Sequence, residues 1–316
     1  MASVVALAQA RASALASHPW LRRLIYPTVF AACFVLFLFL TFPFDDLARS
    51  LEAKVRESGG ELTIERMRPS GLGGVAAFGV KLRMPLAPGA DPLPELTLDR
   101  VDARPEYLLL LLRRLAFTFS AEGYGGKGSG RAALAKDVRQ GLLEALAFTG
   151  ADLDLQRLPI RELSGLEVAG RANFKVDLHK LSPLDLATGT VSATIKGAFV
   201  EGKLTSVSMM PTLPKTALGE VELQGTLDKG AAKIDKCWAR NGDLDAEVDG
   251  TLRLKPLFSL SQADGHVRFK LSEAWLNQNP VYRGLLTAIS AARQGDGNYV
   301  YTLAGPLSSI TARPGR

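Results

Sequence analysis

The stretch of this sequence that most resembles a nucleotide site is a glycine-rich run, GYGGKGSG, at residues 123–130. Its Gly123, Gly125 and Gly128 have the G-x-G-x-x-G spacing that lets a backbone approach a pyrophosphate in dinucleotide-binding folds. That chemistry requires a helix that begins at the run, inside a unit of parallel strands. The surrounding sequence instead alternates as strands do, and the phosphate-loop spacing around Lys127 is missing. We therefore expect a flexible hairpin loop there, and no cofactor.

Histidine and cysteine are the next candidates, as metal ligands or nucleophiles. His18, His179 and His266 are isolated, and none has a second His or a Cys at the spacing of a metal site. We expect no metal, and we place His179 and His266 on polar strand faces. The two cysteines, Cys33 and Cys237, fall in different predicted compartments, so no intramolecular disulfide is expected.

Acidic residues two apart could supply a general acid and base. Three such pairs occur in strand-like segments: Asp152/Asp154, Asp243/Asp245 and Glu247/Asp249. In a strand this spacing puts both carboxylates on one face, so solvated surface is the expected environment. The motifs of serine hydrolases and zinc proteases are missing. We expect a protein that is not an enzyme and has no catalytic residues.

An uncharged apolar run, LIYPTVFAACFVLFLFLTFPF at residues 24–44, predicts a single transmembrane helix. At 1.5 Å per residue it can cross a hydrocarbon core of about 30 Å. Residues 1–23 contain arginine but no acid, and Asp45 and Asp46 follow the run, which indicates a cytoplasmic tail and an exported remainder. A cleaved signal peptide is the main alternative, but the run is long and lacks an Ala-x-Ala type site. A buried core helix is disfavoured by the same length.

The exported part has 35 basic and 32 acidic residues, a balance that argues against nucleic-acid binding. An exported domain of this size without a disulfide fits a Gram-negative periplasm. The predicted location is therefore the inner membrane, with the amino terminus in the cytoplasm and the carboxy-terminal domain in the periplasm.

After the span, residues 45–58 predict an amphipathic helix that lies at the membrane surface or caps the first sheet. Residues 59–316 then predict a mainly β domain. Strands are expected at residues 61–67, 78–84, 95–103, 117–121, 145–155, 168–178, 190–199, 219–227, 231–237, 244–254, 265–271 and 298–304. Because helices separate few of them, we expect an extended, curved antiparallel sheet, as a meander or roll, with a few short helices.

Two helices are expected within this domain. Residues 106–115 include five consecutive leucines, which predict a helix that plugs the core, and residues 273–292 predict one long helix. The strand pattern is clearest at residues 247–255, where charged or hydroxyl side chains alternate with Val248, Leu252 and Leu254. The sheet should have one wet and one dry face, and the dry face must be covered by protein or lipid.

Taken in order, several segments resemble the protein N family of type II secretion systems, in the form found in δ-proteobacteria and spirochaetes, which in turn is similar to AsmA-type anchored β proteins. They are the span ending in FPF, DDLARSLEAKV (residues 45–55), RPSGLGGVAAFGVKLRMP (68–85), LTLDRVDARPEYLLLLL (96–112), the glycine-rich run at 123–130, LGEVELQGTLDKGAAKI (218–234), KPLFSLSQADGHVRF (255–269) and GNYVYTLAGPLSSITARPGR (297–316).

The resemblance implies a non-enzymatic periplasmic component of a type II secretion system, held in the inner-membrane bilayer, that acts by tethering and by contact with other secretion components. It assigns no catalytic residues. An AsmA-like protein that handles lipid, with an apolar groove for acyl chains, is the alternative.

The orientation can be tested with a topology reporter. A phosphatase that is active only after export, fused after Arg316, should be active. A cytoplasm-only reporter fused at the same residue should be silent, because the basic flank holds the amino terminus inside. Activity of the cytoplasmic reporter alone would contradict the prediction.

Overall fold

The computed structural model describes residues 26–30, 33–34, 37, 41–57, 60–71, 73–83, 95–107, 109, 115–134, 143–181, 186–203, 212–254, 261–306 and 309–315. Contacts divide the chain into two units, residues 1–47 and residues 48–316.

The first unit holds pieces of the apolar run, and those described up to Thr41 are helical. Thr41 Oγ1 donates a hydrogen bond of 2.7 Å to the carbonyl of Phe37, one helical turn earlier. Among the described residues, no helix has both the length and the apolar character needed to cross a membrane. Much of the predicted span at residues 24–44, and all of the tail at 1–23, lies outside the described residues. The single transmembrane helix therefore stays a prediction.

Helix α3 (Phe44–Glu57) matches the predicted amphipathic helix to within one residue at each end. It begins with Asp45 and Asp46, whose charges suit the positive end of the helix dipole. Glu52 Oε1 accepts a hydrogen bond of 2.9 Å from the backbone N–H of Ile64 in the first strand. The part of this helix in the second unit therefore caps the start of the sheet, one of the two roles expected from its sequence.

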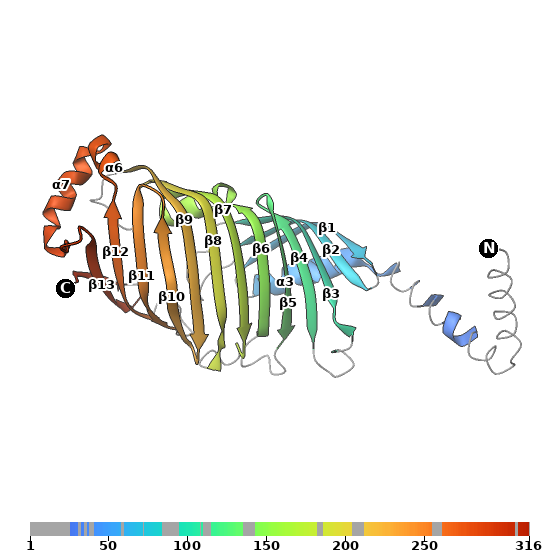
Figure 1. Cartoon of the computed structure of the whole chain (residues 1–316). Coiled ribbons are helices and arrows are strands. Elements are labelled where there is room, and N and C mark those ends of the chain that lie inside the picture. Colours follow the sequence, from blue (N-terminus) through green and yellow to red (C-terminus); the bar gives the residue numbers. More distant parts are fainter. Residues whose placement is uncertain are drawn as a thin grey trace, which may run out of the picture. The chain divides into compact units, whose positions relative to one another are not determined.

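The second unit is one antiparallel sheet of 14 strands whose spatial order is the order of the chain (Figure 1). The strands are β1 (Glu61–Ser70), β2 (Gly74–Arg83), β3 (Leu96–Pro105), β4 (Ala116–Gly123), β5 (Gly126–Leu134), β6 (Leu143–Asp154), β7 (Leu166–His179), β8 (Thr188–Gly202), β9 (Leu213–Asp228), β10 (Ala231–Arg240), β11 (Leu244–Arg253), β12 (Gln262–Leu271), β13 (Tyr299–Pro306) and β14 (Thr311–Pro314). The expected antiparallel meander is confirmed. Strands β5 and β14 were not expected from the sequence.

Burial alternates strictly along β11 and β12, so the predicted wet and dry faces are confirmed there. On the wet face, opposite charges face one another across these strands: Asp245 lies opposite Lys270 and Glu247 lies opposite Arg268, and next to them Asp249 lies opposite His266. Like charges at such positions would repel, so the pattern favours this register over a shifted one.

The predicted helix over residues 273–292 is wrong as a single element. The structure has α6 (Glu273–Gln278), α7 (Pro280–Ala288) and a 3₁₀ turn, η5 (Ser290–Ala292). Pro280 has no N–H to continue α6, and Asn279 before it leaves the helical region, with φ −128° and ψ 69°. Trp275, Leu276 and Tyr282 pack together across this break.

Two further short helices lie beside β7: η2 (Leu155–Arg157) and α5 (Ile160–Ser164). Of the leucine-rich helix expected at residues 106–115, Tyr107 and Leu109 are helical. Leu108 and Leu110–Leu112 lie outside the described residues, so the plug they were expected to form stays a prediction.

A partly buried carboxylate links β1 and β3, the strands on either side of β2. Asp102 Oδ1 on β3 accepts hydrogen bonds from Ser70 Oγ on β1 at 2.7 Å and from Arg100 Nη2 at 3.0 Å. The hydrogen bond from Arg100 is the largest of the effects that hold the pKa of Asp102 below its ordinary value. The charged carboxylate is therefore the form that the fold favours.

The contribution of Asp102 should depend on pH in one direction. Because its folded pKa is lower than its unfolded value of about 3.9, its stabilisation is complete at neutral pH and is lost as pH falls through the folded pKa. Asp102→Asn should lower the free energy of unfolding at pH 7, and the difference from the parent should shrink towards about pH 3. Asp264→Asn, on the exposed wet face of β12, is the control. A difference that grows on acidification would refute the assignment.

Candidate binding surface

One side of the sheet from β4 to β13 is apolar along a continuous row of cross-strand partners. At one level of the sheet the row runs Phe119, Gly130, Phe148, Val176, Val191, Gly225, Ile234, Gly250, Gly265 and Leu303. We call the side of β4–β13 that carries this row the dry face. Its large side chains, such as Phe148, Val176 and Ile234, are only partly buried. A bound partner could therefore bury further apolar surface on this face.

A ladder of four phenylalanine rings crosses the dry face. The ring centroids of Phe117 and Phe119 are 6.1 Å apart, those of Phe119 and Phe148 are 5.6 Å apart, and those of Phe148 and Phe174 are 5.2 Å apart. These separations lie in the range favoured by aromatic pairs. The ladder joins β4, β6 and β7, and it passes over β5, which lies between β4 and β6.

Glycine makes that passage possible. A Cβ atom on Gly128 would lie 2.6 Å from Cζ of Phe148, and one on Gly130 would lie 2.7 Å from Cζ of Phe119. A Cβ atom on Gly150 of β6 would lie 2.5 Å from Cε1 of Phe174. These distances are too short for real atoms, so the rings occupy the space that side chains would fill.

The flexible loop expected at residues 123–130 is therefore wrong. Gly123 ends β4, and Gly126 begins β5 as its cross-strand partner. Only Tyr124 and Gly125 form the turn, with φ of 53° and 74°, the positive values of a tight two-residue hairpin. Strand follows strand here, whereas a dinucleotide site would need a helix at this point.

The other candidate residues also have structural surroundings. His179 and His266 lie on strand faces, next to Asp177 at 3.1 Å and Asp249 at 3.4 Å, as expected. His18 lies outside the described residues. No group of three or more potential metal ligands occurs in the ranges that the structure describes.

The acidic pairs divide into two kinds. Glu247 and Asp249 are exposed on the wet face, as expected. Asp154 instead caps η2 by accepting from the N–H of Gln156 at 3.2 Å. The carboxylate of Asp243 is a backbone acceptor, 3.0 Å from the N–H of Ala217. Asp152 and Asp245 are exposed, as expected. The prediction of simple solvated surface is wrong for Asp154 and Asp243, because turns need side-chain acceptors for unpaired backbone donors.

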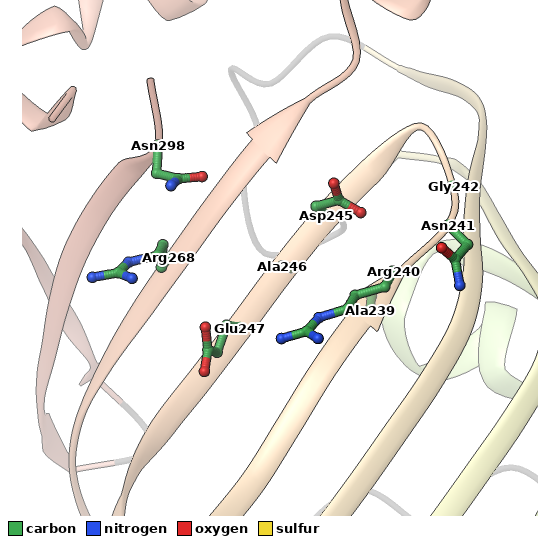
Figure 2. A pocket seen from close by; sticks show the side chains of 9 residues that line it. All are labelled: Ala239, Arg240, Asn241, Gly242, Asp245, Ala246, Glu247, Arg268 and Asn298. Atoms are coloured by element: carbon green, nitrogen blue, oxygen red, sulfur yellow. The ribbon is translucent and has the colours of Figure 1, made fainter. Parts of the chain in front are cut away.

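A polar depression of about 390 Å³ lies at one end of β10–β12, and Figure 2 shows the side chains that line it. It is lined by two arginines, two acids, two asparagines and small residues: Arg240, Arg268, Asp245, Glu247, Asn241, Asn298, Ala239, Gly242 and Ala246. Sequence reasoning missed it, because its residues come from three strands, from the turn between β10 and β11 and from the segment before β13. Their alternating charge is the only pattern in the sequence that pointed to it.

Comparison with family models, with curated proteins and with solved structures finds no match for this chain.

The role of the glycines can be measured. Gly128→Ala should lower the free energy of unfolding by about 1–3 kcal/mol, because its methyl group competes with Phe148 for space. The cost should fall when Phe148→Leu is introduced first. Gly284→Ala in α7 is the control, since its Cβ would meet nothing within 4 Å, and it should be neutral or stabilising. An equal cost of Gly128→Ala with and without Phe148 would exclude the packing explanation.

Proposed function

We propose that this protein is a non-enzymatic component of a type II secretion system, anchored in the inner membrane and facing the periplasm, and that it works through the dry face of its sheet. The order of the resembling segments and the apolar run at residues 24–44 support the anchor and the pathway. The dry face supports the mode of action, which is contact rather than catalysis.

The observation that carries the proposal is the partial burial of the dry face over ten consecutive strands. Apolar surface removed from water stabilises a complex by roughly 25 cal/mol per Å². A face whose phenylalanine, valine and isoleucine side chains are partly exposed therefore favours an apolar occupant.

The two ends of the sheet are less suited to docking by strand addition. On β1, the N–H of Ile64 is already bonded to Glu52 of α3. Strand β14 has only four residues, and Pro314 lacks the N–H that an added strand would need. Short edges, proline and covering helices are the usual protections against edge pairing. The dry face is thus the better candidate for contact.

A second function, AsmA-like handling of lipid, is favoured by the uniform chemistry of the same face. The cross-strand row from Phe119 to Leu303 contains no charged or hydrogen-bonding side chain. A polypeptide occupant would have to satisfy its own backbone N–H and C=O groups there, whereas an acyl chain has none to satisfy.

Photocrosslinking in cells distinguishes these functions. A crosslinking amino acid at Val248, on the dry face of β11, should capture an occupant. One at Thr251, three residues further along β11 and exposed on the wet face, should not. Capture of another secretion component supports the first function, and capture of phospholipid supports the second. Equal capture at both positions, or none at Val248, would contradict a working dry face.

A further inference from the structure

The depression in Figure 2 lies on the wet face, so it is separate from the surface invoked for the proposed function. Its two cations come from different strands, Arg240 at the end of β10 and Arg268 in β12. Its two anions, Asp245 and Glu247, come from β11 between them. Figure 2 shows these charged side chains standing on the same side of the three strands.

The guanidinium of Arg240 is held by an aromatic ring. Its Cζ lies 5.0 Å from the ring centroid of Trp238, two residues earlier on the same strand face. A guanidinium stacked on an indole ring is attracted to it and keeps the N–H groups at its edge available to an acceptor. Lys236, on the other side of Trp238, is instead paired with Glu222 at 2.7 Å. Of the two cations beside Trp238, Arg240 is therefore the one that can bind an anionic ligand.

Among the described residues, acidic residues lie near both arginines but form no ion pair with them, and the charge of Arg268 also contributes to lowering the pKa of Asp296. Glu220 stands opposite Arg240 in the strand register, and Glu247 stands opposite Arg268. In spite of this, no ion pair within 4.0 Å joins Arg240 or Arg268 to a carboxylate of the described residues. The site thus presents two donors of fixed charge without a bound acceptor.

The segment before β13 completes the depression. Asn298 donates from its backbone N–H and from Nδ2 to the carboxylate of Asp296, at 3.0 and 2.7 Å. These hydrogen bonds, the backbone one first, hold the pKa of Asp296 below its ordinary value. One N–H of Nδ2 is used in this way, and the carboxamide oxygen of Asn298 is an acceptor.

The charge balance selects the ligand. A lone phosphate near the two arginines would be repelled by Asp245 and Glu247, and a lone ammonium near the acids would be repelled by the arginines. Charges of both signs also border the depression, since Lys270 stands opposite Asp245 and Glu220 stands opposite Arg240. We propose that this depression is a binding site for a small zwitterion, in which a phosphoryl or carboxyl group contacts Arg240 and Arg268 and an ammonium group contacts Glu247 and Asp245. A lipid headgroup and a free amino acid both have this chemistry.

Calorimetric titration of the full chain in an uncharged detergent tests the site with phosphoethanolamine, β-alanine and inorganic phosphate as probes. At least one of the two zwitterions should bind saturably in the millimolar range. Arg240→Gln or Arg268→Gln should weaken that binding by about tenfold, because each removes a charged hydrogen-bond donor. Arg253→Gln, at the exposed end of β11 and outside the depression, should leave the affinity unchanged.

Glu247→Gln separates a zwitterion site from a simple anion site. The substitution should weaken the zwitterion, which loses an ammonium partner, and should strengthen inorganic phosphate, which loses a repelling neighbour. Tighter binding of phosphoethanolamine than of β-alanine assigns the site to a phosphoryl headgroup, and the reverse assigns it to an amino-acid-like carboxylate. Failure of both zwitterions to saturate, or a shift of both ligand classes in the same direction in Glu247→Gln, would overturn the proposal. The dry face takes no part in this site. The result of the binding experiment therefore does not affect the interpretation of the photocrosslinking experiment.

Discussion

Every strand of this sheet pairs with its neighbour in the chain, and this pairing determines which face of the sheet each side chain occupies. When 14 strands follow one another in a single antiparallel ladder, each apolar side chain from β4 to β13 must join the same face as its cross-strand partner. The result is one broad dry surface. Local features serve this surface: the glycines of β5 lie beneath the rings of Phe119 and Phe148, so the aromatic ladder continues where a side chain would block it.

The opposite face meets a different requirement. It has to stay in water and keep the strands in register, and charges of opposite sign on β11 and β12 do both. The ends of the sheet are closed off by other means, through Glu52 of α3 at one end and Pro314 at the other. The molecule thus limits contact through its edges and leaves its faces as working surfaces. The apolar face offers area, and the charged face offers a depression between Arg240 and Arg268.

Much of this fold follows from the sequence, because a period of two is a local property that each strand carries for itself. The antiparallel meander and the two-sided pattern of β11 could be predicted in that way. Three features could not. The glycine-rich run at 123–130 resembles a loop by composition, and the rings of neighbouring strands explain Gly128 and Gly130. Pro280 is a local signal that a helix ends, but the apolar residues on both sides of it favoured the prediction of one continuous helix. The polar depression depends on register across three strands, which no single segment encodes.

The central claim is that the dry face has an occupant in the working protein, and Cys237 allows this to be measured. Cys237 lies on that face, as the cross-strand partner of Leu223, and it is partly buried. In the full chain carrying Cys33→Ser, the rate of alkylation of Cys237 can be compared before and after the bound partner or lipid is stripped with detergent. The account predicts slow alkylation in the protein as isolated and a clear increase after stripping. An unchanged rate would contradict it.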